Sequence, residues 1–246
     1  MEEKIDGWID THERFVAFLD IMGFKDFVYR NSHEDVKKML ESLYPSIYII
    51  EKEAQEKLSG STTSDQKKYP AFGDSVVKPI IFSDSIVLIT GDDSEQSANK
   101  IIFCIEWLCG NAIGNKVPIK GALAHGEFTA DLKKSLYFGK PLIDAYELES
   151  ELCLYSVVLH NTMEKYLYEN KLIEVLEKFA LFRYPTPIGS SFINHYHVDW
   201  THAFEKEVNI EGLVSEFYFK VSGRPRSYVD NTLKFVRQIK TTRKRE

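Results

Sequence analysis

The sequence is poor in the features that mark secreted, disulfide-bonded and membrane-spanning proteins. Its 246 residues include three cysteines, Cys104, Cys109 and Cys153. Their odd number and wide spacing fit neither a disulfide framework nor a zinc knuckle. No run approaches the roughly 18 apolar residues that a membrane-spanning helix needs, and the first residues lack a signal-peptide pattern. We therefore expect a reduced, cytoplasmic protein that does not enter a membrane.

The chain has fewer basic residues than acidic ones. The chain has 31 Lys and Arg against 37 Asp and Glu, which gives a formal net charge of -6. An acidic balance argues against general binding to nucleic acids or to membrane surfaces. The one strongly basic segment is 240–246, and we interpret it as a solvated, frayed terminus. The hydrophobic content of 43% is enough for one sizeable core.

The periodicity of apolar residues predicts alternating strands and helices. Up to residue 160, we expect strands at 14–21, 75–81, 86–90, 117–124, 135–138 and 154–159, and helices at 33–57, 95–109 and 141–151. Later we expect a helix at 162–178, strands at 180–184 and 192–200 around a turn at 185–187, and a helix at 227–240. This order predicts an α+β, ferredoxin-like core at 1–160 with a mixed or antiparallel sheet and helices on one of its faces. Residues 161–246 then add a strand hairpin and a helix to the same domain.

Two apolar runs are each interrupted by one carboxylate, Asp20 in the first and Asp84 in the second. A buried carboxylate costs several kcal/mol unless it is paired or holds a metal. For one run alone, an aspartate that caps a turn at a strand end is the simpler interpretation. Two such runs in one chain predict a two-carboxylate metal site on a sheet.

Four segments resemble motifs of the class III nucleotidyl cyclases and occur in the order of that family. FLDIMGF at 18–24 resembles the first metal motif, and FSDS at 82–85 resembles the second. GALAHGEF at 121–128 resembles the Gly-Ile-His-x-Gly strand, and YFGKPLIDAYELE at 137–149 resembles the helix motif. Together they cover roughly residues 12–160, and the agreement in order is far more specific than any single segment.

The resemblance implies a reaction and a set of metal ligands. In the family, the 3′-hydroxyl of a nucleoside triphosphate attacks its own α-phosphate, and pyrophosphate leaves. Two divalent cations, Mn²⁺ or Mg²⁺, assist such a displacement. The resemblance assigns the carboxylates of Asp20 and Asp84 and the backbone carbonyl of Ile21 as their ligands. The amides of residues 22–25 are candidates for binding the triphosphate.

The chain departs from the purine cyclases at the residues that contact the base and the transition state. Ile80 stands where purine cyclases commonly place a base-binding lysine four residues before the second aspartate. Ile143 and Glu147 stand where they place an asparagine and an arginine. One explanation is an inactive module that only binds nucleotide; a purine cyclase and an unrelated fold are further alternatives. The favoured explanation is a cyclase for a smaller base, since the pattern resembles the bacterial pyrimidine cyclases of antiphage signalling (Pycsar type).

Candidate substrate contacts follow from side-chain chemistry near these motifs. Phe82 and Tyr137 can stack on a base through their flat faces, and Phe24 lies in the expected triphosphate-binding segment. Lys140 is our first candidate for the missing cation. Further candidates for the same role are Lys120, Lys78 and Arg183. For all four basic residues, a solvated surface position is the simpler interpretation.

The resemblance also implies partners. It implies a homodimer with composite sites, in which one chain holds the metals and its partner contributes the 138–149 segment to the base pocket. The expected substrate is UTP, with CTP as the alternative, and the cyclic product acts on a separate effector protein. We interpret His195 and His197 as part of a polar strand face rather than as metal ligands, and His125 as a strand-end residue.

Overall fold

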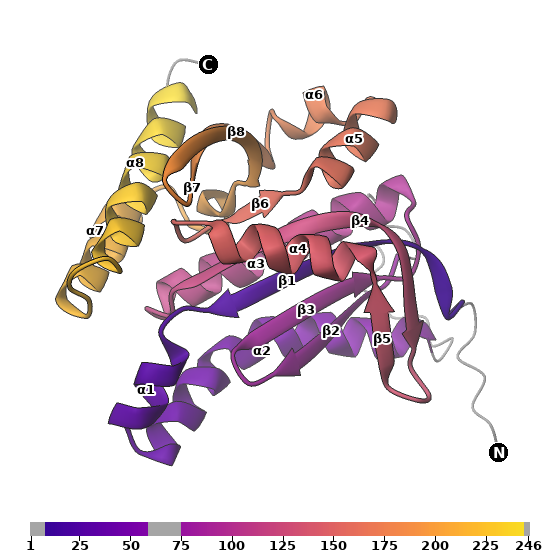
Figure 1. Ribbon diagram of the computed structural model, residues 1–246, viewed down its shortest axis with the longest axis horizontal. Coiled ribbons are helices and arrows are strands. Elements are labelled where there is room, and N and C mark those ends of the chain that lie inside the picture. The colour runs from indigo at the N-terminus through magenta and orange to yellow at the C-terminus, as the bar shows by residue number, and fades with distance from the viewer. Residues whose placement is uncertain (1–7, 59–74, 244–246) are drawn as a thin grey trace.

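The computed structural model describes residues 8–58 and 75–243, and within them eight strands form one sheet (Figure 1). The strand order is β2-β3-β1-β4-β6-β8-β7, and β5 pairs with the outer end of β4. Among the described strands only β4 and β6 pair in parallel. The strands are β1 (Thr11–Ile21), β2 (Val77–Phe82), β3 (Ser85–Thr90), β4 (Ile119–Asp131), β5 (Leu136–Gly139), β6 (Val157–Leu159), β7 (Leu181–Ile188) and β8 (Ser191–Val198). The mixed sheet confirms the predicted α+β class.

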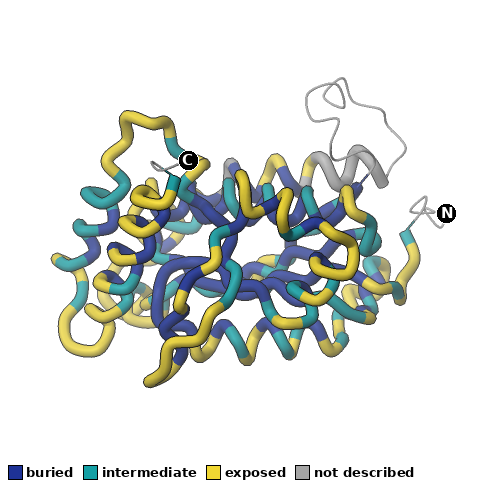
Figure 2. Tube along the Cα trace, turned by 90° about the horizontal axis from the view of Figure 1, so that it is seen from above, coloured by how far each residue is buried: buried dark blue, intermediate teal, exposed yellow. Residues whose placement is uncertain are grey.

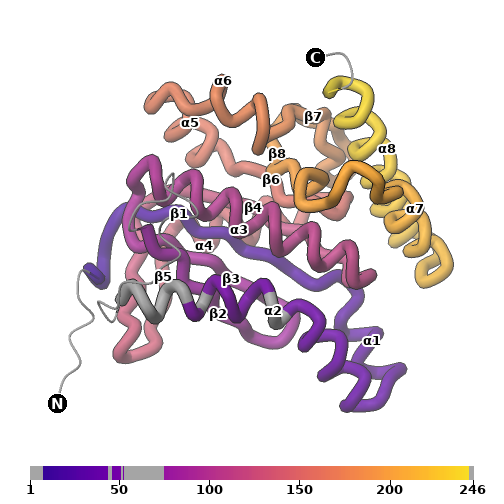
Figure 3. Tube along the Cα trace, turned by 180° about the vertical axis from the view of Figure 1, so that it is seen from behind, coloured from indigo at the N-terminus to yellow at the C-terminus, as the bar shows by residue number. Residues whose placement is uncertain are grey.

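Helices cover both faces of the sheet, so the expectation of helices on one face alone is wrong. Their bounds are α1 (Phe24–Arg30), α2 (His33–Leu58), α3 (Glu95–Gly114), α4 (Lys140–Glu151), α5 (Asn161–Glu169), α6 (Ile173–Leu176), α7 (Ile210–Ser215) and α8 (Arg226–Arg243), with short 3₁₀ helices η3 (Trp200–Ala203) and η4 (Glu216–Phe219). Helix α4 lies in front of β1 and β4, while α2 and α3 lie behind the sheet (Figures 1 and 3). None of the described helices is long and apolar enough to cross a bilayer.

The alternation of side chains along β1 places Asp20 on the α4 face. Phe15, Ala17 and Leu19 are completely buried in the main core. Successive side chains of a strand point to opposite faces, so Phe18 and Asp20 point the other way. The Phe18 ring contacts the Tyr146 ring of α4, with centroids 5.3 Å apart. Figure 2 shows that burial is concentrated in the sheet between these helix layers.

Strand β4 is longer than the predicted 117–124 segment, because Gly126 does not end it. The antiparallel ladder with β1 continues through the pair Arg14↔Gly126 as far as Thr11↔Thr129. Arg14 is completely buried there and donates a hydrogen bond of 2.7 Å to the Thr90 carbonyl. The continued pairing with β1 therefore outweighs the local tendency of a glycine to interrupt a strand.

The predicted turn at 185–187 is wrong, because Pro185 and Pro187 lie inside β7. The chain turns instead after Ile188, where Gly189 has a φ of 55°. Proline lacks the amide hydrogen that an inner strand must donate, so it is tolerated on an edge strand. Strand β7 is such an edge, paired with β8 alone among the named strands.

The segment predicted as one helix at 162–178 forms two helices, α5 and α6. Helix α5 ends where the Asn170 amide donates to the Tyr166 and Tyr168 carbonyls. Lys171 then adopts a left-handed φ of 59°, which stops helical propagation. The following hairpin, β7 and β8, extends the sheet beyond β6 through the pair Val158↔His197.

The interpretation of the basic C-terminal segment as frayed is wrong for residues up to 243. Helix α8 continues to Arg243, whose Nη2 lies 2.6 Å from Oδ2 of the completely buried Asp199. A buried carboxylate needs such a partner, which explains why the last helical turn stays ordered. Burial and, to a smaller extent, the negative charge of Asp199 raise the pKa of nearby Glu106 to about 7. Residues 244–246 lie outside the described part of the chain.

Candidate active site

The fold brings Asp20 and Asp84 together from segments far apart in the sequence. Asp20 lies near the end of β1, directly opposite Ser85 of β3 in the antiparallel register. Asp84 lies in the tight turn between β2 and β3, after Ser83 with a φ of 58°. The Ile21 amide donates a hydrogen bond of 2.9 Å to the Asp84 carbonyl. The two predicted metal motifs therefore form one structural unit.

The Asp20 carboxylate is in an environment that disfavours its own charge. Burial, the negative charge of Glu149 and that of Asp84 raise its pKa to about 6, while Lys120 acts in the opposite direction. Within the described residues, this carboxylate forms no hydrogen bond or ion pair. A half-buried carboxylate without a partner, next to a second carboxylate, is suited to bind a cation.

A buried ion pair between Lys120 and Glu149 lies beside Asp20. The Lys120 Nζ is 3.0 Å from Glu149 Oε1, and each residue is 4% exposed. The interpretation of Lys120 as a solvated surface cation is therefore wrong: the lysine lies beneath α4 because it is opposite Asp20 on the covered face of the sheet. The sequence did not indicate the pairing of Lys120 with Glu149, the last residue of the 137–149 motif, because the two residues are far apart in the chain.

The segment after Asp20 supplies fewer free amides than the 22–25 prediction assumed. The Met22 amide is already used in a 2.8 Å hydrogen bond to the Pro118 carbonyl. Gly23 has a left-handed φ of 75°, which favours glycine and lets α1 begin at Phe24. The Phe24 side chain is partly buried against the main core. Phe82, at the tip of the β2–β3 hairpin, is 82% exposed and free to contact a ligand.

Tyr137 and Lys140 lie elsewhere in the same chain. Tyr137 pairs with Ala130 at the outer end of β4, whereas Asp20 pairs with Lys120. About 33 Å of strand, at roughly 3.3 Å per residue, separates positions 120 and 130. Lys140 is exposed at the first residue of α4, at the opposite end of that helix from Glu149. One chain therefore assembles the two carboxylates but not these two substrate candidates.

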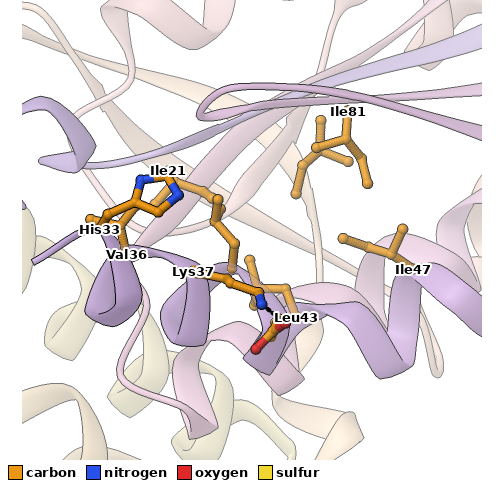
Figure 4. A pocket seen from close by; sticks show the side chains of 10 residues that line it. Ile21, His33, Val36, Lys37, Leu43, Ile47 and Ile81 are labelled. Carbon is orange, nitrogen blue, oxygen red and sulfur yellow. Dashed lines mark ion pairs between the residues drawn. The ribbon is translucent and has the colours of Figure 1, made fainter. Parts of the chain in front are cut away.

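A cavity that the sequence did not predict lies on the other face of the sheet, between α2 and the hairpin (Figure 4). It has a volume of about 320 Å³, and the side chains of Ile21, Ile81 and Ile86 form its wall toward the sheet. Because Ile21 and Asp20 point to opposite faces, the cavity is separate from the carboxylates.

The donor set of the carboxylate site fits a hard divalent cation. The described part of the chain has no cluster of three or more His, Cys, Asp or Glu side chains arranged for a metal. The candidate ligands are therefore two carboxylates and the Ile21 carbonyl. Mg²⁺ or Mn²⁺ prefers such oxygen ligands and completes its coordination shell with water or phosphate. Asp20, Asp84 and Ile21 would hold the ions.

The three histidines discussed above, His125, His195 and His197, contact protein side chains away from the carboxylate site. His197 is completely buried, with Nε2 2.6 Å from Thr186 Oγ1 and Nδ1 3.1 Å from Ser156 Oγ. It therefore does not belong to an exposed polar face, since the Phe235 ring of α8 packs against it. Burial lowers its pKa to about 3. His195 Nδ1 lies 3.3 Å from Glu164, and His125 Nε2 lies 3.2 Å from Asp93.

Comparisons with known proteins found similarity in structure only. No protein-family model and no curated protein matches the sequence. The monomeric guanylyl cyclase domain of the RhoGC fusion protein from the aquatic fungus Blastocladiella emersonii is similar, with 15% identity, a TM-score of 0.51, and coverage of 78% of this chain and 97% of that chain. A dimer of the RhoGC domain with an unusual arrangement has 16% identity, a TM-score of 0.50, and coverage of 77% and 98%.

A third similar structure is the catalytic core of a rhodopsin-guanylyl cyclase with converted specificity, in complex with ATPαS. It has 16% identity, a TM-score of 0.50, and coverage of 76% of this chain and 95% of that chain. The similarity extends over nearly the whole length of each solved domain. The chain therefore has the fold of the class III nucleotidyl cyclase catalytic domains.

Proposed function

We propose that this protein is a metal-dependent nucleotidyl cyclase that converts UTP to 3′,5′-cyclic UMP and pyrophosphate. The observation that carries the proposal is the joining of Asp20 and Asp84 at adjacent strand ends, with Asp20 left unpaired. The solved domains of the same fold support it, since they are described as guanylyl cyclases and one contains a nucleoside triphosphate analogue.

The two carboxylates have a direct role in this reaction. Asp20, Asp84 and the Ile21 carbonyl would hold two divalent cations, Mn²⁺ or Mg²⁺. Such ions activate the attacking hydroxyl oxygen and stabilise the charge on the leaving pyrophosphate. Phe82, exposed on the hairpin that carries Asp84, is placed to stack on a nucleotide base.

The proposal of a pyrimidine substrate is based on Ile80. Ile80 pairs with Val87, which in turn pairs with Phe18, so Ile80 lies on the same sheet face as Asp20. Its neutral side chain packs beside the smaller apolar cluster around Val16. It offers no donor for a purine where purine cyclases have a lysine. The product would be a messenger for a separate effector protein in antiphage defence.

A direct assay tests the substrate. The protein is incubated with Mn²⁺ and each of ATP, GTP, CTP and UTP, and the products are separated by chromatography. We expect cyclic UMP as the main product, because a site without a base-binding lysine favours the smaller ring. Cyclic CMP would support the related cytidylate cyclase, whereas a cyclic purine would contradict the pyrimidine assignment. Nucleotide binding without any product would indicate an inactive module.

We further propose that the active form is a homodimer with composite sites. Tyr137 and Lys140 lie far from Asp20 of their own chain, so they can act only at a partner's site. The α4 face beside Asp20 also exposes apolar side chains, Ile143 at 58% and Tyr146 at 55%. Such residues are typical of an interface.

Sedimentation velocity at the assay concentration checks this prediction. We expect wild-type protein to sediment as a dimer, and Tyr146→Asp to shift it to a monomer with little activity, because a charge would be buried at the interface. Tyr168→Asp is the matched control, since Tyr168 is exposed on α5, away from α4. A strictly monomeric but active wild-type enzyme would contradict the composite site.

A further inference from the structure

Asp20 and Lys120 face each other across two strands but do not pair. They are direct partners in the antiparallel register of β1 and β4, and opposite charges in such positions normally attract each other. Instead, the Lys120 Nζ lies 3.0 Å from Glu149 Oε1 and donates to the carbonyls of Glu149, at 2.7 Å, and Leu152, at 3.2 Å.

Two of these three acceptors belong to Glu149 near the C-terminal end of α4, and the third belongs to Leu152, directly after the helix. A lysine ammonium group has three hydrogens to donate, so none is left for Asp20. The pair is closed off from solvent, since Lys120 and Glu149 are each only 4% exposed, and the Tyr228 ring of α8 lies 5.7 Å from Nζ. A buried ammonium of this kind cannot readily exchange its partners for water, so the charge of Glu149 holds it in place together with the two backbone carbonyls.

We propose that Glu149 is a positioning residue that holds Lys120 away from Asp20 and thereby keeps the Asp20 carboxylate available for a divalent cation. This inference rests on the metal site of the proposed function. Without the charge of Glu149, Lys120 can turn toward the carboxylate of its cross-strand neighbour Asp20. A lysine that pairs with Asp20 competes with the metal for the same oxygen atoms. Helix α4 therefore controls metal binding although none of its residues is a ligand.

The test measures Mn²⁺ binding without nucleotide, by calorimetry and by the electron paramagnetic resonance of free Mn²⁺. Glu149→Gln keeps the shape of the side chain but removes its charge, and we expect affinity to fall by about 10- to 100-fold, as for other residues that support metal ligands. The double variant Lys120→Met with Glu149→Gln removes the competing cation, and we expect affinity to return to within about threefold of wild type. Glu169→Gln, in the exposed pair of Lys165 and Glu169, is the control.

Recovery in the double variant separates this role from a simple contribution of negative charge. If the double variant binds Mn²⁺ as weakly as Glu149→Gln, or if Glu149→Gln binds like wild type, the inference is wrong. Circular dichroism checks folding. If Glu149→Gln fails to fold, the double variant alone decides: wild-type affinity supports the inference, and a loss above about tenfold overturns it.

Failure of the proposed function gives a different result. In that case wild-type protein binds no Mn²⁺, or Asp84→Asn binds it as tightly as wild type does. Either outcome removes the metal site, and the inference with it. If Asp84→Asn weakens Mn²⁺ binding but the Glu149 variants do not, the metal site remains and only the inference about Glu149 is wrong.

Discussion

Asp84→Asn is expected to lower the rate of cyclic nucleotide formation by about a thousandfold or more while the protein stays folded. Metal ions stabilise the transition-state charge by several kcal/mol, and each 1.36 kcal/mol corresponds to about tenfold in rate. The fold should survive because the backbone carbonyl of Asp84, which asparagine keeps, accepts the hydrogen bond from Ile21. No hydrogen bond or ion pair of the Asp84 carboxylate is found in the described part of the chain.

The measurement is product formation under saturating UTP and Mn²⁺, with circular dichroism and thermal unfolding on the same samples. Asp26→Asn is the matched control, since Asp26 is exposed in the first turn of α1. We expect that control to keep nearly full activity. Full activity of Asp84→Asn would remove Asp84 from the metal site. Loss of structure in Asp84→Asn would show that the carboxylate supports the fold instead.

Gly121→Ala is expected to lower the free energy of unfolding by about 3 kcal/mol, at the upper end of overpacking effects. A Cβ at this position would lie 2.5 Å from the Phe18 carbonyl oxygen and 3.0 Å from Leu19 Cγ. The oxygen belongs to the backbone of β1, so it cannot rotate away, and the two central strands must separate. Gly121 pairs with Leu19, next to the pair Asp20↔Lys120, so the change should also reduce activity.

Urea unfolding followed by circular dichroism gives the stability difference. Gly114→Ala is the matched control, because its Cβ would meet only Phe204, at an ordinary contact distance of 3.6 Å. A Gly-to-Ala change without strain is expected to alter stability by less than about 1 kcal/mol. Equal stabilities of the two variants would mean that β1 and β4 are not as closely packed as the structure shows.

The candidate metal residues were predictable because their chemistry is visible in short segments. Asp20 and Asp84 each interrupt an apolar run, and the motifs around them occur in the order of a known family. Their proximity was not visible in either segment. It results from the antiparallel pairing of β1 with β3 and from the hydrogen bond between the Ile21 amide and the Asp84 carbonyl.

Charged residues were the least predictable part, because a sequence does not show which charges meet. Lys120 and Arg243 look like ordinary surface cations, yet each pairs with a buried carboxylate, Glu149 or Asp199. Neither carboxylate is close to its partner in the sequence, so no local pattern indicates the pair. The same limit applies to His197, which becomes completely buried only when α8 packs on the hairpin.

The sequence by itself determined the α+β class, most strands and helices, and the residue types of the candidate site, because these depend on local periodicity and short motifs. Tertiary structure decided which of those residues meet. It joined Asp20 to Asp84 and tied Lys120 to Glu149. It also placed Tyr137 and Lys140 away from Asp20 of their own chain. The physical reason is that strand register and helix packing bring distant segments together, and burial then sets the cost of every charge that they carry.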